Sequence, residues 1–296
     1  MKTTALIMAG GRGERFWPKS RKSLPKQFLS LTRDGKTMIQ LTVERILPLV
    51  AIEDIYIATN ESYLGLVKEQ LPDLPAENII CEPIGRNTAP CIGLGAMHVL
   101  KKYDDALMLV LPSDHLIKQK TLFRGTLQNA MQVAEENSNL VTIGITPDYP
   151  ETGYGYIRFD ENISLGQAYK AAKFVEKPDL ETAKTYFESG QYLWNSGMFV
   201  WKVSSILNKM EHLMPETYQA LVNTKQAFGT EQEQSVLHDE FYKMRSMSID
   251  YGILEHADDI YTVPGSFGWD DVGSWLAMER INPTNEFGNV MQGNLI

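Results

Sequence analysis

Residues 3–28 read TTALIMAGGRGERFWPKSRKSLPKQF, a short apolar run that leads directly into a glycine-rich, basic loop. The continuously apolar run at residues 3–9 predicts a strand buried on both faces, as in a parallel sheet. Gly10, Gly11 and Gly13 allow main-chain conformations that other residues avoid, so their amides can approach a ligand closely. The opening of the chain therefore predicts a strand that delivers a ligand-binding loop.

The loop concentrates positive charge on a chain whose formal net charge is -9. Six basic residues and one acid lie from Arg12 to Lys26, and successive glycine amides beside them can cradle phosphate oxygens. The P-loop is excluded because no lysine follows a glycine at its spacing, and Phe16 breaks the dinucleotide fingerprint. A tight glycine turn with a solvated basic face is the alternative, but Pro18 and Pro25 stiffen the loop so that its charges converge. A polyphosphate is the expected ligand.

Strand-like and helix-like segments alternate over the first half of the chain. Apolar runs recur at 54–59, 106–111 and 140–145. The segments between them with helical periodicity are residues 37–50, 89–103 and 122–137. This alternation predicts an α/β fold with a parallel or mostly parallel sheet.

The second half has a different pattern. Residues 153–159 and 169–176 predict antiparallel strands around a turn, and helices are expected at about 179–189 and 203–225. The last stretch, residues 288–296 (GNVMQGNLI), has strand-like alternation, so residues 283–296 are predicted to be the start of a truncated or minimal C-terminal β element. No linker composition precedes residue 280.

Composition narrows the class of protein. The chain has 296 residues, of which 43% are hydrophobic and 22% charged, as is usual for a globular domain. The net negative charge argues against a nucleic-acid surface. Cys81 and Cys91 do not make a disulfide framework, and no apolar run reaches the length of a membrane span or resembles a signal peptide. A cytoplasmic protein with no membrane association is the expectation.

Further motifs lie where strands are expected to end. Residues 82–90 (EPIGRNTAP) follow a short strand and open a helix, for which Asn87 or Thr88 is a suitable N-cap. Residues 109–115 (LVLPSDH) end a buried strand, so Asp114 is placed either to hold a metal or simply to form a turn. Its neighbour His115 is expected to cap the loop, with orientation of Asp114 as the alternative.

These motifs together resemble the sugar-1-phosphate nucleotidyltransferases. The pattern AGGxGxRxxP…PKQF is similar to that family's signature, and its FWP and PKQF spelling is close to the mannose-1-phosphate guanylyltransferases. The resemblance extends through LPxDH, FVEKP (174–178), LWNSGMF (193–199) and the WxDVGxW pattern in 267–275. Arg12 departs from the usual small residue at its position, which leaves its role open.

The resemblance implies a Rossmann-like nucleotidyltransferase core with a mostly parallel mixed sheet and a smaller α+β sugar-binding extension. The resemblance covers residues 2 to about 282, and the implied nucleotidyltransferase domain is 1–282, with nucleotide binding in about 1–150 and sugar binding in about 151–265.

The resemblance also assigns site residues. The implied catalytic residues are Arg15, Lys26, Asp114 and Asp271, with Mg²⁺ held by Asp114 and Asp271. The implied nucleotide-binding residues are Ala9, Gly10, Gly11, Arg12, Gly13, Glu82, Arg86, Asn87 and Thr88. The implied sugar-phosphate-binding residues are Tyr154, Gly155, Glu176, Lys177 and Asn195. Asp250 and Glu255 rank below these, Asp270 falls on the variable position, and Trp269 and Trp275 are expected to be packing residues.

The implied reaction converts GTP and mannose 1-phosphate into GDP-mannose and pyrophosphate. A pyrophosphorylase for another base or sugar, or a non-catalytic subunit that binds a nucleotide sugar, are the alternatives. The sequence leaves the oligomeric state open, with a homodimer as one option.

Overall fold

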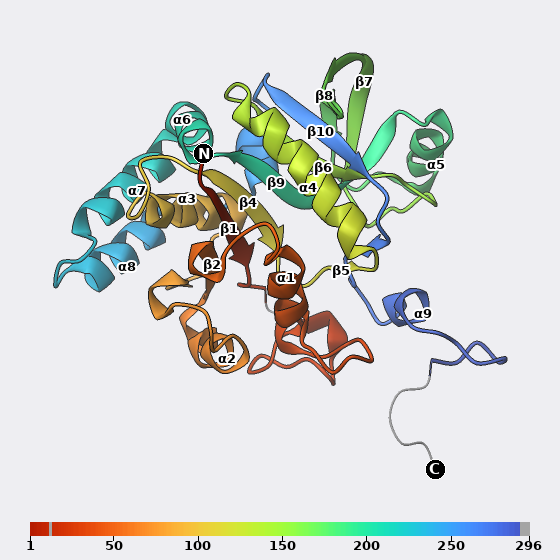
Figure 1. Ribbon diagram of the computed structural model, residues 1–296, viewed down its shortest axis with the longest axis horizontal. Helices are drawn as coiled ribbons and strands as arrows, with labels where there is room; N and C mark the ends of the chain where they lie inside the picture. Colours follow the sequence, from red (N-terminus) through yellow and green to blue (C-terminus); the bar gives the residue numbers. More distant parts are fainter. Residues whose placement is uncertain (12–13, 291–296) are drawn as a thin grey trace.

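The computed structural model describes residues 1–11 and 14–290, and its centre is a nine-stranded mixed sheet (Figure 1). The strand order is β3-β2-β1-β4-β9-β6-β10-β8-β7. The strands of this sheet are β1 (Thr3–Met8), β2 (Ile55–Asn60), β3 (Ile79–Glu82), β4 (Leu107–Pro112), β6 (Leu140–Ile145), β7 (Tyr156–Leu165), β8 (Ala168–Val175), β9 (Tyr192–Lys202) and β10 (Ile260–Gly265). β5 (Leu116–Ile117) and β11 (Trp269–Asp270) form a separate two-stranded sheet.

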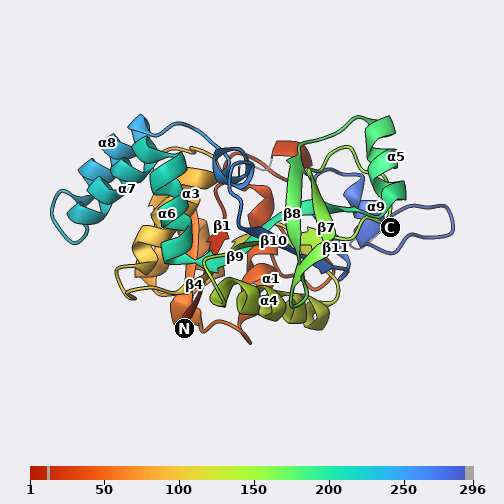
Figure 2. The ribbon, with the colours of Figure 1, turned by 90° about the horizontal axis from the view of Figure 1, so that it is seen from above.

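Helices cover both faces of the nine-stranded sheet (Figures 1 and 2). Their bounds are α1 (Met38–Ile46), α2 (Leu64–Gln70), α3 (Thr88–Val99), α4 (Lys120–Glu135), α5 (Leu180–Ser189), α6 (Val203–Leu213), α7 (Pro215–Ala227), α8 (Glu233–Lys243) and α9 (Ala277–Ile281). None of these helices is long and apolar enough to cross a bilayer.

The two halves of the sheet have different strand directions. β3, β2, β1 and β4 are parallel, as the alternating pattern predicts. β9 then runs antiparallel to both β4 and β6, and its first residues also pair with β7. β7 and β8 form the expected antiparallel pair. The expected mixed α/β fold is confirmed. β9 joins the four parallel strands to a mixed half, in which β6 and β10 are parallel whereas β8 is antiparallel to both β10 and β7.

Two hydrophobic cores lie on opposite faces of the sheet. Ala5 and Ile7 of β1 face the core that contains side chains of α1, α2 and α4, whereas Leu6 faces the core formed with α3 and α6–α8. Both faces of β1 are therefore buried, which explains why its sequence is continuously apolar from Ala5 to Met8 instead of alternating. In Figure 1, α4 lies in front of β9, β6 and β10.

Two expectations need refinement. The single helical segment predicted over 203–225 is two helices, α6 and α7, which meet at Met214. The break follows from Pro215, which disfavours helical geometry in the residue before it and is well suited to the first turn of α7. In the predicted C-terminal β element, Thr284 and Val290 form an isolated antiparallel bridge, and residues 291–296 lie outside the described residues.

α3 packs closely on β1, and a substitution at Gly95 tests this contact. A Cβ atom on Gly95 would lie 2.5 Å from Cδ2 of Leu6, a fully buried side chain. We expect Gly95→Ala to lower the free energy of unfolding by about 1–3 kcal/mol, because the added methyl overpacks this contact. Urea denaturation monitored by circular dichroism measures the change.

Gly65→Ala is the matched control, because Gly65 is exposed in α2 and a Cβ atom there meets nothing within 4 Å. We expect it to be neutral or to stabilise the protein by up to about 1 kcal/mol. Equal stability of the two variants would contradict the close packing of α3 on β1.

Candidate active site

A cavity of about 500 Å³ opens at the carboxyl ends of the parallel strands. This edge of an open α/β sheet is where ligands are expected to bind. Of the sequence-predicted site residues, the cavity is lined by Gly10, Gly11, Glu82, Arg86, Asn87, Thr88, Asp114, Tyr154, Gly155, Glu176, Lys177, Asn195 and Asp271. Segments that are far apart in the sequence thus meet around one space.

The remaining predicted residues have other positions. Ala9 is fully buried at the end of β1 and does not line the cavity. Lys26 also does not line the cavity, but its ammonium contacts Asp114 and Asp271, which do. Arg12 and Gly13 lie outside the described residues, as does the side chain of Arg15, whose main chain belongs to the 3-10 turn Glu14–Phe16.

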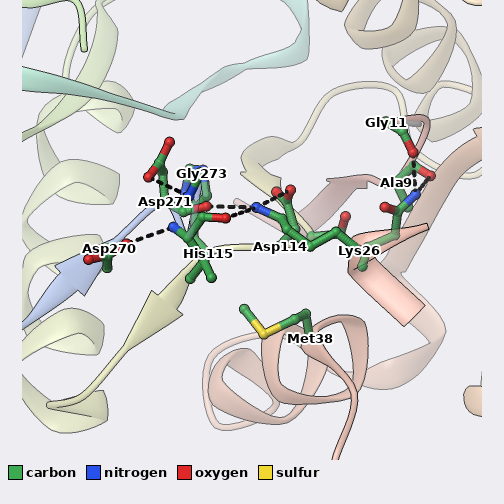
Figure 3. Close-up of polar contacts among 12 residues, drawn as sticks. Ala9, Gly11, Lys26, Met38, Asp114, His115, Asp270, Asp271 and Gly273 are labelled. Atoms are coloured by element: carbon green, nitrogen blue, oxygen red, sulfur yellow. Dashed lines mark hydrogen bonds and ion pairs between the residues drawn. The ribbon is translucent and has the colours of Figure 1, made fainter. Parts of the chain in front are cut away.

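The Lys26 ammonium joins two loops that carry predicted metal ligands (Figure 3). Its Nζ lies 2.7 Å from Asp114 Oδ2, and it donates to the main-chain oxygens of Asp271 at 2.7 Å and Val272 at 3.1 Å. Lys26 is only 7% exposed, so these contacts replace most of its hydration. Although burial alone would raise it, the charge of Lys26 holds the pKa of the Asp114 carboxyl below its usual range.

The Asp271 carboxylate is held in place by a hydroxyl and a main-chain amide. Its Oδ1 accepts from Tyr154 Oη at 2.9 Å and from the Gly273 amide at 3.0 Å. A Cβ atom at position 273 would lie 2.8 Å from Asp271 Oδ2, so any other residue there would force this carboxylate to shift. Burial, and then the negative charge of Asp271, raise the pKa of Tyr154, which therefore stays a hydroxyl donor.

Asp270 has a different, structural environment. Its carboxylate accepts from the Val272 amide at 2.7 Å and pairs with Arg280 Nε at 2.7 Å. It is 8% exposed, whereas the adjacent Asp271 lines the cavity. The two neighbouring aspartates therefore have separate surroundings, in agreement with their separate positions in the motif.

His115 connects the Asp114 loop to the strand before Asp271. Its Nδ1 accepts from Trp269 Nε1 at 3.1 Å, and its main-chain oxygen accepts from Arg45. Burial lowers the pKa of His115 to about 4, so the imidazole is neutral near pH 7 and can act as an acceptor. The structure thus gives His115 a contact across the β5–β11 pair.

Glu82 is a buried carboxyl whose hydrogen-bonding capacity is not used up. It is 5% exposed, and its Oε1 has no hydrogen-bond partner within residues 1–11 and 14–290. Burial raises the pKa of Glu82 to about 7, opposed by a hydrogen bond with the Cys91 thiol. A Cβ atom on Gly10 would lie 3.2 Å from Glu82 Oε2, so the glycine loop packs directly against this carboxyl. A buried polar atom that faces a cavity without a partner is a ligand-binding candidate.

The residues after Glu82 line the cavity, but their side chains also contact protein. The Arg86 guanidinium donates to the main-chain oxygens of Phe241 and Tyr242. Asn87 is the N-cap of α3, and Thr88 Oγ1 accepts from the Ile249 amide. The N-cap interpretation is confirmed for Asn87, and Arg86 and Thr88 attach this segment to the region that precedes Asp250.

The opposite end of the cavity contains the predicted sugar-binding residues. Glu176 lies against Gly155, where a Cβ atom would be 3.0 Å from Glu176 Oε2, and its Oε1 pairs with Lys177 at 2.8 Å. Asn195 Nδ2 donates to Asp250 Oδ1 at 2.7 Å. Burial raises the pKa of Asp250, which also lines the cavity.

Sequence reasoning underrated some residues and missed others. Asp250 has a larger part in the cavity wall than its low rank indicated, whereas Glu255 lines a different cavity beside β8. Gln27, Ser113 and Ser196 line the main cavity and were not singled out. Gln27 directly follows Lys26 in the PKQF motif, and this adjacency to a predicted catalytic residue is the sequence feature that indicates a position near the site.

The carboxylates present suit a magnesium ion that is shared with phosphate oxygens. Among the described residues, no group of three or more His, Cys, Asp or Glu side chains forms a metal cluster. Magnesium does not require one, since it is commonly held by one or two carboxylates plus substrate phosphates. Asp114 and Asp271 line the same cavity. Because Gly273 has no Cβ atom, the Asp271 carboxylate has room to lie there.

Comparisons with known proteins agree with this arrangement. The mannose-1-phosphate guanylyltransferases of Salmonella montevideo and Escherichia coli (strain K12) are each 43% identical to this chain, over 99% and 100% of it. The chain spans 63% of the length of each of these relatives.

Solved structures are also similar. A Thermus thermophilus protein described as a mannose-1-phosphate geranyltransferase is 37% identical, with a TM-score of 0.85 over 95% of this chain and 79% of that one. A Helicobacter pylori protein described as a mannose-6-phosphate isomerase is 25% identical, with a TM-score of 0.73 over 91% of this chain and 100% of that one.

The family model for nucleotidyl transferases matches residues 4–286. Since that match covers nearly the whole chain, and since the sheet edge, the glycine loop and the carboxylates occur in the expected order, the chain belongs to the nucleotidyl transferase family.

Proposed function

We propose that this chain transfers GMP from GTP to α-D-mannose 1-phosphate, giving GDP-mannose and pyrophosphate. The observation that carries the proposal is that one cavity brings together the features such a transfer needs. The glycine loop lies beside Asp114 and Asp271, which contact the buried Lys26. The buried carboxyl of Glu82 lies at one end of the cavity, and the polar cluster around Asn195 lies at the other. The named activity of the 43% identical relatives supports the same substrates. We further propose that residues 1–150 contribute mainly nucleotide binding and residues 151–265 mainly sugar binding.

Nucleotidyl transferases typically use a divalent metal ion, and we propose Mg²⁺ for this chain. Asp114 and Asp271 would hold it, and when bound it would offset charge on the phosphates. Lys26 fixes the two aspartate loops relative to one another and contributes positive charge beside them. Arg15 is proposed to act on the triphosphate.

The proposed reaction is an in-line displacement. An oxygen of the sugar phosphate forms a bond to the α-phosphorus of GTP while the bond to the pyrophosphate oxygen breaks. The nucleophile is an anion at neutral pH, so the chain needs no general base. Its contribution is positioning and electrostatic stabilisation of the charged transition state.

A panel of nucleotides and sugar phosphates tests the proposed activity directly. We expect pyrophosphate release from GTP with mannose 1-phosphate, and little from ATP, UTP or dTTP or with glucose 1-phosphate. Release should stop when Mg²⁺ is removed with EDTA and resume when it is restored. Binding of GDP-mannose without turnover under any of these conditions would instead favour a non-catalytic nucleotide-sugar-binding subunit.

The adjacent aspartates offer a matched pair of variants. We expect Asp271→Asn to lower kcat by at least about 100-fold, because it removes a proposed metal ligand while keeping the side-chain shape. Asp270→Asn should retain most of kcat but lower the melting temperature, because it weakens the pair with Arg280. Steady-state kinetics and thermal denaturation of both variants check this, and similar kcat values for the two would refute the assignment.

Glu82 is proposed to recognise the base, because guanine presents two adjacent hydrogen-bond donors that one ionised carboxylate can accept. The pKa of Glu82 is about 7, so the carboxylate form is lost as the pH falls through 7. We expect KM for GTP to rise as the pH falls from 8 to 6. Glu82→Gln should lower the preference for GTP over ATP by about 10-fold or more.

ATP is the control for protonation of the triphosphate itself, which affects both nucleotides alike. In Glu82→Gln the difference between GTP and ATP should no longer depend on pH. Because burial raises the pKa of the Glu82 carboxyl from 4.5 to about 7, the folded state binds more protons than the unfolded state, so stability falls as the pH rises from about 4.5 to about 7. An unaltered GTP to ATP ratio in Glu82→Gln would rule out base recognition by this residue.

A further inference from the structure

Gln27 makes two hydrogen bonds to the glycine loop that the proposed chemistry does not use. The residue is 2% exposed and follows Lys26 in the 3-10 turn Lys26–Phe28. Its Nε2 donates to the main-chain oxygen of Ala9 at 2.8 Å and to that of Gly11 at 2.9 Å. One side-chain amide therefore donates to the carbonyls of the residues on either side of Gly10, and dashed lines end at Ala9 and Gly11 in Figure 3.

These bonds determine the direction of a main-chain amide. The Ala9 carbonyl and the Gly10 N–H belong to one planar trans peptide, so they point in opposite directions. With the carbonyl held by Gln27, and also by Thr59 Oγ1 at 3.0 Å, the Gly10 N–H must point away from both side chains. Gly10 lines the cavity, and within the described part of the chain no acceptor is recorded for its N–H or for that of Gly11.

Glycine cannot supply this orientation itself. Gly10 and Gly11 have no Cβ atom to restrict their φ and ψ angles, so a free loop would sample many directions of its amides. Gln27 is anchored because it is buried and because the neighbouring Lys26 is fixed to Asp114 and Asp271. The same turn therefore fixes the predicted metal ligands through one side chain and the glycine loop through the next.

We propose that Gln27 is a positioning residue that orients the amides of the glycine loop toward the phosphates of the nucleoside triphosphate. This inference rests on the proposed function. It assigns Gln27 no contact with the reacting atoms, and its effect is exerted through the peptide between Ala9 and Gly10.

The central test replaces the amide without changing the length of the side chain. Gln27→Met removes both donors, and we expect a loss of about 30-fold in kcat/KM for GTP, as two neutral hydrogen bonds would give. KM for mannose 1-phosphate should change by less than about threefold. Gln27→Glu should be more impaired than Gln27→Met, because an ionised carboxylate would face two carbonyl oxygens.

Gln40→Met is the matched control for lost stability. Gln40 also uses its amide on the main chain, since it donates to the Gln70 oxygen and accepts from the Thr37 amide, but it lies outside the cavity. We expect Gln40→Met to lower the melting temperature without altering KM for GTP. This comparison separates a positioning effect from general destabilisation.

Calorimetric titration of GTP into the full chain, with Mg²⁺ and without sugar phosphate, isolates binding from turnover. Weaker binding to Gln27→Met than to the wild type and to Gln40→Met supports the proposal. Equal GTP affinity and equal kcat in Gln27→Met and the wild type would overturn the role of Gln27 alone. Absence of binding of GTP, ATP, UTP and dTTP to the wild type would overturn the proposed function and this inference with it.

Discussion

The buried ammonium of Lys26 is the interaction on which the geometry of the cavity depends. It ties the loop after β4 to the loop after β11 through one carboxylate and two carbonyl oxygens, although the two loops are far apart in the sequence. The Lys26 side chain is 8% exposed and the Asp114 side chain 32%, so loss of Asp114 would leave a mostly buried ammonium without its counter-charge, which is destabilising. Such a cost restricts the two aspartate loops to one relative arrangement before any ligand arrives.

Three carboxylates around the cavity share a second constraint, which is close packing on glycine. Glu82 lies against Gly10, Glu176 against Gly155, and Asp271 against Gly273. In each pair a Cβ atom would lie within about 3.2 Å of a carboxylate oxygen. The glycines therefore do more than permit close approach of a ligand. They also leave room for acidic side chains beside the main chain, which explains how so many carboxylates fit around one small space.

The sequence predicted the local elements well because each had a strong pattern of its own. The apolar run at 140–145 coincides with β6, and Pro215 accounts for the helix break that periodicity alone overlooked. Site residues at strand ends could be placed for the same reason. The contacts of Gln27 could not be predicted, because they depend on where the turn after the loop folds back onto it. The pairing of Asn195 with Asp250 likewise depends on packing between distant segments.

The position of β9 explains why the two ends of the cavity face each other. In a purely parallel sheet only the carboxyl ends of the strands meet at the edge where the ligand binds. β9 instead runs antiparallel between β4 and β6, so its early residue Asn195 lies at the edge where β4 leads to Asp114. The strand thereby presents polar groups from the second half of the chain to loops from the first. A transfer between two phosphorylated substrates requires this kind of shared edge, because both must be held with their reacting atoms in contact.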